Sequence, residues 1–163
     1  IAAKTAEALR VMNQKIKDRE MDKRYLAIVE GTPKPKEGSL KGYLFKDEKK
    51  NRVFVTDKMQ PGAKTCQTNY RTLATAKGLT LVECELITGR THQLRVHCSY
   101  LGMPILGDPQ YGGAALAYSE KVGIHTQALC AKKLEYEIKT NNWCERYCNF
   151  HHIFRESMPK PTH

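Results

Sequence analysis

The first stretch of the chain has the hydrophobic periodicity of an amphipathic helix. Thr5 is placed to cap the first turn, and Glu7 lies where an acidic residue suits the helix dipole. Basic residues gather toward the end at Lys15, Lys17 and Arg19, so we expect a helix over residues 4–19 with a basic outer face. Its apolar side chains recur every three to four positions, which places them on one face: Ala8, Leu9, Met12 and Ile16.

Alternating apolar and polar residues then predict a series of strands. The segment 23–30, "KRYLAIVE", alternates and stops at Gly31. "SLKGYLF" and "RVFVT" flank "KDEKKN" and predict a hairpin, while "CQTNYRTLAT" and "LTLVECELI" flank a turn at Lys77 and Gly78. The last of these runs is almost continuously apolar, which is typical of a central strand. Further on, "IHTQALCAKKLEYEI" predicts either a strand pair or one long strand.

A dense polar stretch, "ELITGRTHQLRVHCSYLGMPILGDPQYGG" (85–113), predicts a strand-to-helix junction. Gly89 breaks the preceding strand, and Gly102 is placed to end the helix. We place residues 90–92 on the first helical turn, where unpaired backbone amides attract anions. The helix keeps an apolar side, formed by Leu94, Val96, Cys98 and Leu101. The segment "MPILGDPQYGG" that follows has the composition of a tight loop.

These elements define the fold class. Two clear helices and six or more strands joined by short turns predict an α+β fold around a mixed, mostly antiparallel sheet with flanking helices. We find no glycine-rich nucleotide-binding motif and no serine nucleophile elbow. We expect the last residues, "MPKPTH", to be a flexible tail, with a domain over 1–155 and a tail over 156–163.

The charge of the chain adds a class of partner. The 163 residues carry a formal net charge of +10, and a basic excess of this size in a small domain favours a polyanionic partner, most often nucleic acid. The alternative is a soluble basic protein without such a partner. No apolar run has the ~18 residues of a membrane helix, and the first residues lack the pattern of a signal peptide. We therefore expect no membrane contact.

The cysteines point to a reducing compartment. Six cysteines are scattered without a framework spacing, which indicates reduced thiols in a cytoplasmic protein. The densest group is Cys144, Cys148, His151 and His152. A metal site there is one interpretation, but the spacing differs from that of a zinc knuckle, and chance clustering is the default interpretation. We therefore expect no metal.

Several side chains are candidates for chemistry on residue type alone. Arg95 suits either a buried carboxylate or a phosphate, because its planar fork fixes orientation, and a structural salt bridge is an equal alternative. His92 and His97 are more often satisfied polar residues near a core than catalytic groups. Tyr25 lies on an alternating strand, where a packed aromatic is the usual role, and stacking on an extruded RNA base is the other.

Taken together, the motifs resemble those of the RluA-type pseudouridine synthases. The stretch "ITGRTHQLRVHCSYLGMPILGDPQYG" is similar to that family's signature. "AAKTAEALRVMNQ", "KRYLAIVEG", "PGAKTCQTNYR" and "IHTQAL" resemble further family segments, in the same order. The resemblance runs from Ile1 to about Glu137, and the ordered set is far more specific than any single segment.

The resemblance implies a fold, a reaction and roles for residues. It implies a pseudouridine synthase-like sheet around an RNA cleft, and isomerisation of uridine to pseudouridine in ribosomal or transfer RNA without cofactor or metal. The target base must leave its stack. Tyr25 matches the family's active-site tyrosine, and Arg95 matches the basic residue that pairs with the catalytic aspartate. Arg90, His92 and Gln93 match the rest of the motif, with packing or RNA contact as roles; Lys64 is a further RNA-binding candidate, and Asp108 matches a turn position that we expect to be structural.

The chain departs from the family pattern in one respect that bears on catalysis. The family's nucleophilic aspartate belongs to a His-Arg-Leu-Asp motif, which the resemblance places upstream of Ile1. The expected sheet is then incomplete on its N-terminal side, and this chain alone is expected to be inactive. The sequence after Glu137 also departs from the family's usual ending. The alternatives are a non-catalytic RNA-binding relative and an unrelated basic nucleic-acid-binding module.

Overall fold

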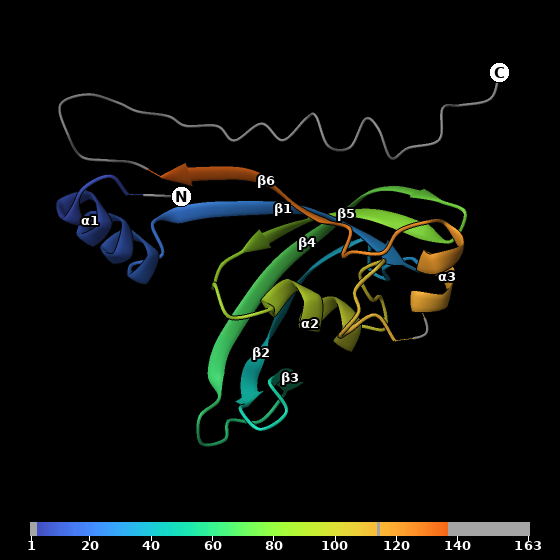
Figure 1. Ribbon diagram of the computed structural model, residues 1–163, viewed down its shortest axis with the longest axis horizontal. Helices are drawn as coiled ribbons and strands as arrows, with labels where there is room; N and C mark the ends of the chain where they lie inside the picture. Colours follow the sequence, from blue (N-terminus) through green and yellow to red (C-terminus); the bar gives the residue numbers. More distant parts are fainter. Residues whose placement is uncertain (1–2, 114, 137–163) are drawn as a thin grey trace.

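A single antiparallel sheet forms the body of the protein (Figure 1). The computed structural model describes residues 3–113 and 115–136. Its strand order is β3-β2-β4-β5-β1-β6, and each neighbouring pair is antiparallel. The strands are β1 (Met21–Glu30), β2 (Glu37–Asp47), β3 (Arg52–Thr56), β4 (Lys64–Ala76), β5 (Leu79–Leu86) and β6 (Leu129–Tyr136). The helices are α1 (Ala6–Lys17), α2 (Gln93–Tyr100) and α3 (Ala115–Lys121). The α+β class and the antiparallel sheet are confirmed.

Local turn chemistry accounts for the hairpins that the sequence predicts. Lys77 and Gly78 both have positive φ, 51° and 77°, which is the backbone of a tight turn that matches the twist of β4 and β5. At the β2–β3 turn, the Asp47 carboxylate accepts hydrogen bonds from the backbone N–H groups of Lys49 and Lys50. Strand β5 lies between β4 and β1, so its prediction as an inner strand is also confirmed.

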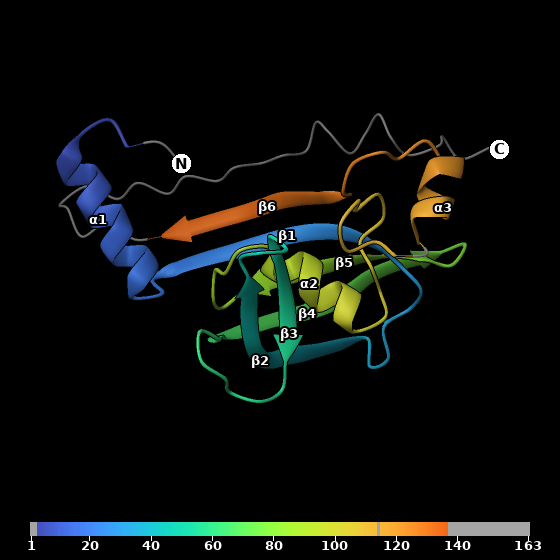
Figure 2. The same ribbon diagram turned by 60° about the horizontal axis from the view of Figure 1, so that its bottom comes forward.

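Helix α1 forms as predicted but lies beyond one end of the sheet. The hydroxyl of Thr5 accepts a hydrogen bond from the backbone N–H of Ala8, which caps the first turn. Met12 is the buried residue of this helix, whereas Leu9 and Ile16 are each 52% exposed. Figure 2 shows α1 projecting past the start of β1. Its apolar face is therefore only partly covered by the described residues.

Helix α2 covers one face of the sheet. Leu94 and Cys98 of α2 pack against inward-facing residues of β1 and β5 in a core that comprises Ala27, Val29, Val82, Cys84, Leu94, Cys98 and Ile105. Because side chains alternate along a strand, Arg24, Glu83 and Glu85 point to the opposite face. The sheet thus has an apolar face under α2 and a charged face away from it.

Three local features differ from the sequence expectation. Helix α2 begins at Gln93, and the N-cap residue His92 is left-handed with φ 54°, so residues 90–92 lie in the preceding loop and not on the first turn. Leu101, expected on the apolar side, is 37% exposed just past the helix end. Helix α3 occupies part of a segment for which no helix was expected. For the segment "IHTQALCAKKLEYEI", the sequence left open a strand pair or one strand, and the structure has one strand, β6.

The described residues hold neither a membrane-crossing helix nor a metal cluster. Within residues 3–113 and 115–136, no helix is long and apolar enough to cross a membrane. In the same ranges, no group of three or more His, Cys, Asp or Glu side chains is arranged to hold a metal ion. The cluster of Cys144, Cys148, His151 and His152 lies outside the described residues, as does the expected tail over 156–163.

Candidate active site

Arg95 is held by a two-point ion pair with Asp108. Nε of Arg95 donates to Oδ2 of Asp108 and Nη2 donates to Oδ1, both at 2.7 Å. The Asp108 side chain is 0% exposed and that of Arg95 is 13% exposed. A guanidinium in this geometry has its plane fixed. Nη1 of Arg95 forms no hydrogen bond with the described residues, so one edge of the fork is left for a further partner.

The electrostatics of the pair favour its charged form. Burial alone would raise the pKa of Asp108, but the hydrogen bonds from Arg95 and from the backbone N–H groups of Tyr111 and Gln110 lower that pKa below its ordinary value. The hydrogen bond with Asp108 raises the pKa of Arg95 further. Asp108 therefore acts both as the turn residue that we expected and as the carboxylate partner of Arg95.

Tyr111 links this pair to the edge strand β3. Its hydroxyl accepts a hydrogen bond from the backbone N–H of Val53 at 3.1 Å, which leaves the hydroxyl proton for Nδ1 of His92 at 3.2 Å. The guanidinium carbons of Arg95 and Arg52 lie 5.0 and 5.3 Å from the Tyr111 ring centroid. Tyr111 thus contacts two guanidinium groups through its ring and is fixed at its hydroxyl.

Gln93 serves the packing of the loop that precedes α2. Its side chain is 2% exposed, and its amide nitrogen donates to the Gln67 carbonyl and to the hydroxyl of Thr68, each at 2.9 Å. Its amide oxygen accepts from the hydroxyl of Thr88 and from the backbone N–H of Arg90. Of the two roles that the sequence leaves open for Gln93, this structure favours packing, because its polar atoms are already used.

His97 is buried next to Gln93 and has an internal role. Its Nδ1 lies 2.9 Å from the Thr68 hydroxyl, and its Nε2 lies 3.1 Å from the Cys66 sulfur. Burial lowers the pKa of His97 to about 4 and raises that of the Cys66 thiol. Neither group is ionised near neutral pH, so the pair has the character of a satisfied polar core.

The exposed basic residues of the site surround the loop between β5 and α2. Arg90 is exposed, and its Nε donates to the Thr65 carbonyl at 3.2 Å, beside the exposed Lys64. The Lys23 ammonium lies 3.6 Å from the position that a Cβ on Gly89 would take. An open hollow of about 480 Å³ adjoins the same region, with Arg19, Lys41, Thr65 and Thr88 among its lining residues.

His92 is less available than Arg90. It is half-buried, and burial followed by the nearby Arg95 charge lowers its pKa below the ordinary value. Its ring meets the ring of Tyr111 edge-on, with centroids 5.7 Å apart. The ring atoms of His92 that do not contact Tyr111 are the ones left for a further partner.

Tyr25 lies in β1, opposite Cys84 of β5 and Ala131 of β6. Its half-buried side chain packs against the core cluster that contains Leu94 and Cys98, the neighbours of Arg95 in α2. Its hydroxyl forms no hydrogen bond in the described part of the chain. The structure therefore brings Tyr25 to the α2 face of the sheet, while Arg95 is engaged with Asp108.

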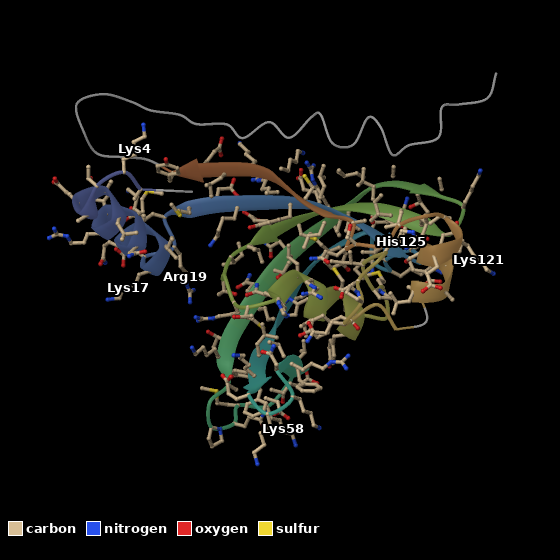
Figure 3. All side chains as sticks on the ribbon, viewed as in Figure 1. Lys4, Lys17, Arg19, Lys58, Lys121 and His125 are labelled. Carbon is tan, nitrogen blue, oxygen red and sulfur yellow. The ribbon has the colours of Figure 1, made fainter. Side chains whose placement is uncertain are left out.

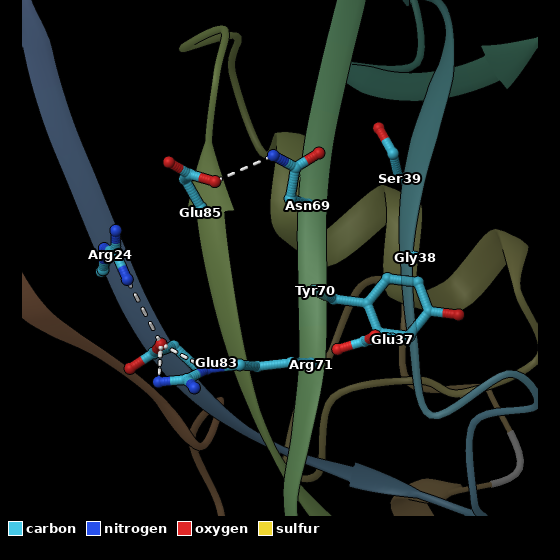
Figure 4. A pocket seen from close by; sticks show the side chains of 9 residues that line it. All are labelled: Arg24, Glu37, Gly38, Ser39, Asn69, Tyr70, Arg71, Glu83 and Glu85. Atoms are coloured by element: carbon cyan, nitrogen blue, oxygen red, sulfur yellow. Dashed lines mark hydrogen bonds and ion pairs between the residues drawn. The ribbon is translucent and has the colours of Figure 1, made fainter.

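The opposite face of the sheet carries a second, separate ion-pair system. Figure 4 shows Arg24 and Arg71 converging on Glu83, in an open groove of about 520 Å³. The Glu83 side chain is 4% exposed. Its Oε1 lies 2.8 Å from Nη2 of Arg71 and 3.7 Å from Nη1 of Arg24, and Lys132 also pairs with Glu83. The positive and negative charges of these side chains offset one another, so this groove offers little net positive charge to an anionic ligand.

Positive charge is otherwise spread around the molecule. Figure 3 shows Lys17 and Arg19 at the end of α1, Lys58 on the loop between β3 and β4, and Lys121 near the end of α3. Lys17 and Lys121 therefore lie at opposite ends of the sheet. Arg90 and Lys23 lie at the β5–α2 loop, whereas Arg52 of β3 lies near Arg95, on the same Tyr111 ring.

The sequence did not indicate several residues of the site. For Asp108 the sequence predicts a turn role only, and it indicates no site role for Tyr111, Arg52, Lys23 or Lys41. One signal was available for Asp108, because an aspartate that follows "PILG" sits among apolar residues and requires a cation when buried. The positions of the others depend on contacts between segments that are far apart in the chain.

Comparison with known proteins shows the family. The model of the family described as RNA pseudouridylate synthase matches residues 1–100. Ribosomal large subunit pseudouridine synthase D of Borreliella burgdorferi is 39% identical over 112 residues, which are 69% of this chain and 34% of that protein. Pseudouridylate synthase RPUSD2 of Mus musculus is 36% identical over 123 residues, which are 76% of this chain and 22% of that protein.

Solved structures agree with the sequence comparison. Human RNA Pseudouridylate Synthase Domain Containing 1 is 25% identical with a TM-score of 0.71, over 89% of this chain and 61% of that one. Human RNA Pseudouridylate Synthase Domain Containing 4 shares the fold, with 23% identity and a TM-score of 0.73, over 94% of this chain and 67% of that one. The chain thus spans only part of these relatives. It belongs to the RNA pseudouridylate synthase family.

Proposed function

We propose that this chain forms the part of an RNA pseudouridine synthase catalytic domain that supplies the tyrosine and the arginine of the active site. The observation that carries the proposal is the state of Arg95: two of its nitrogens are fixed on buried Asp108, and Nη1 remains unused by the described residues. A guanidinium held in this way is prepared to bind a second carboxylate. By the family resemblance, that carboxylate would be the nucleophilic aspartate of the family's His-Arg-Leu-Asp motif.

The proposed reaction needs no group beyond the protein and the RNA. The glycosidic bond of a uridine breaks, the uracil rotates, and its carbon five is joined to the ribose. Arg95 would hold the catalytic carboxylate ionised and oriented, and the Tyr25 ring would stack on the extruded base. A half-buried aromatic on the same sheet face as α2 suits that second role.

RNA binding is proposed for the basic residues around the β5–α2 loop. Arg90 and Lys64 are exposed, and His92 contributes through its remaining ring edge. Lys23, Arg19 and Lys41 add positive charge beside the same loop and its hollow. Contacts of this kind bind phosphates and offset the cost of unstacking the target base.

We further propose a cytoplasmic protein that acts on ribosomal or transfer RNA. Several similar proteins are named ribosomal large subunit pseudouridine synthases, from Borreliella, Zymomonas and Vibrio, which favours ribosomal RNA. Three of the cysteines are free and buried, at positions 66, 84 and 98, as suits a reducing compartment.

The test is to express the complete coding sequence and assay its product on host RNA. Pseudouridine can be detected by carbodiimide labelling and primer extension, and we expect new stops that disappear when the motif aspartate is changed to asparagine. A complete protein with an intact motif that forms no pseudouridine in any host RNA would contradict the proposal. RNA binding without product would instead support a non-catalytic RNA-binding relative.

A further inference from the structure

Asp108 is positioned more rigidly than a turn residue requires. Each of its carboxylate oxygens accepts one nitrogen of Arg95 at 2.7 Å. Oδ1 also accepts the backbone N–H groups of Gln110 and Tyr111, both at 3.0 Å. With four donors on a carboxylate that is 0% exposed, neither oxygen is free to turn.

The loop that carries Asp108 is itself held at both sides. The backbone N–H of Gly107 donates to the hydroxyl of Ser119 in α3, and the N–H of Gly112 donates to the Asp108 carbonyl. Arg52 of β3 donates to the Gln110 carbonyl at 2.8 Å. These contacts join the loop to α3 on one side and to the β2–β3 hairpin on the other.

We propose that Asp108 is a positioning residue for catalysis: it fixes the plane of the Arg95 guanidinium so that Nη1 faces the catalytic carboxylate. This inference rests on the proposed function, because it assigns Asp108 a task only if Arg95 serves the reaction. Asp108 itself would touch neither the RNA nor the reacting atoms. Tyr111 assists because the central carbon of the guanidinium lies over its ring, 5.0 Å from the ring centroid.

A structural ion pair and a positioning pair predict different kinetics. If the pair only stabilises the fold, its loss lowers the melting temperature and leaves the turnover of the folded enzyme unchanged. If it positions Arg95, the folded enzyme loses kcat, because a misplacement of about 1 Å can reduce the rate roughly 100-fold. The KM for RNA should change little in that case, since phosphate contacts lie elsewhere.

The chain provides a matched control on the other face of the sheet. Glu83 is also nearly buried and accepts two nitrogens of an arginine, Nε and Nη2 of Arg71, each at 2.8 Å. The change Glu83→Gln therefore also removes the charge of a buried carboxylate that pairs with an arginine, here with both arginine nitrogens on Oε1 and with Arg24 and Lys132 as further partners. We expect it to lower the melting temperature and to leave kcat unchanged.

The experiment compares Asp108→Asn, Asp108→Glu and Glu83→Gln in the complete protein. Asp108→Asn keeps an oxygen for the backbone N–H groups of the turn but removes one acceptor from Arg95. We expect kcat to fall about 100-fold with KM within about threefold. Asp108→Glu keeps the charge and displaces it by one methylene, so it should fold even if Asp108→Asn does not, and kcat should fall at least tenfold.

A double-mutant cycle connects the loss to Arg95. If Asp108 acts through Arg95, adding Asp108→Asn to Arg95→Ala should cost little further activity, because the effects of coupled residues do not add. Wild-type kcat in either Asp108 variant, or additive losses in the cycle, would overturn the inference while leaving the proposed function intact. Absence of pseudouridine with the wild-type protein would overturn both.

Discussion

Arg95 connects the architecture of this protein to its proposed chemistry. Its guanidinium is bound at two nitrogens, packed on an aromatic ring and only slightly exposed. Its orientation is fixed by a planar, two-point pair with a carboxylate. The arrangement therefore suits a fixed internal partner better than a mobile RNA backbone.

The first prediction concerns the loss of that arginine. Arg95→Ala in the complete protein should reduce single-turnover activity at least ~100-fold, because the catalytic carboxylate would lose its cation. RNA affinity, measured by fluorescence anisotropy, should change less than about threefold. Equal losses in activity and affinity would show that Arg95 contacts phosphate. Arg71→Ala, on the charged face, is the matched arginine control.

The second prediction concerns the pH dependence of stability at His97. The folded-state pKa is about 4, below the ordinary 6.5, because the buried ring is desolvated. Above pH 6.5 the ring is neutral in both states and has no effect. As pH falls from 6.5 toward 4, the unfolded state takes up a proton that the folded state does not, so stability declines by about 3 kcal/mol in total.

Urea unfolding between pH 7 and 4.5 would measure this decline. His97→Gln removes the titrating group and should flatten the part of the slope that it causes. His125 is exposed, so the control His125→Gln should retain the wild-type slope. An unchanged slope in His97→Gln would show that the buried ring is not the source.

At the scale of elements, the loop between α2 and α3 leaves no room for a side chain at Gly107. A Cβ on Gly107 would lie 2.2 Å from the Thr126 carbonyl oxygen, and the residue has φ +72°. Gly123 has nearly the same φ, +74°, but nothing lies within 4 Å of its Cβ position. Comparing alanine substitutions at these two glycines therefore separates the cost of backbone strain from the cost of a steric clash.

The third prediction uses this pair. Both alanine variants bear the cost of a left-handed backbone, about 1–2 kcal/mol. Gly107→Ala should lose a further 1–3 kcal/mol or so, because the Thr126 backbone must move. The free energies of unfolding from urea titrations would test the difference. Equal values for the two variants would mean that the loop relaxes without cost.

The elements that the sequence predicted correctly are those specified by neighbouring residues. The Thr5 cap, the turn at Lys77 and Gly78 and the alternation of β1 each act within a few positions of the chain. Helix α3 and the start of α2 were missed because the deciding contacts are distant. The hydroxyl that fixes Nδ1 of His92, for example, belongs to Tyr111.

In the candidate site, too, the sequence indicates some features, and others depend on contacts between distant residues. The sequence and the family resemblance indicated Tyr25 and Arg95 as site residues, and their proposed roles remain to be tested. For Gln93 the sequence leaves both packing and RNA contact open as roles, and the hydrogen bonds to its partners on β4 favour packing. Asp108 and Arg95 are thirteen positions apart, and only the fold brings them together.

At the scale of the whole molecule, charge bears on the proposed binding of RNA. The net charge of +10 provides a general attraction that salt weakens. The exposed residues Lys64 and Arg90 lie beside the site, whereas Lys121 lies near the far end of the sheet (Figure 3). Their contributions to binding should differ for that reason.

The fourth prediction is a difference in salt dependence. The slope of log Kd against log salt should fall by about 0.7–0.9 for each RNA phosphate that a variant no longer neutralises. Lys64→Ala and Arg90→Ala should each show this decrease in titrations of the complete protein with RNA, and Lys121→Ala should not. A decrease of equal size for Lys121→Ala would mean that binding is not localised at the β5–α2 loop.

The strand order has a consequence for how the protein folds. Strands β4 and β5 are joined by a two-residue turn. Strand β1 pairs with β5, from which three strands separate it along the sequence, and with β6, from which most of the described chain separates it. Closing long loops is slower than closing short ones. We therefore expect the β4–β5 hairpin to appear early and β1 to join late, so the strand that carries Tyr25 would complete the sheet among the last steps of folding.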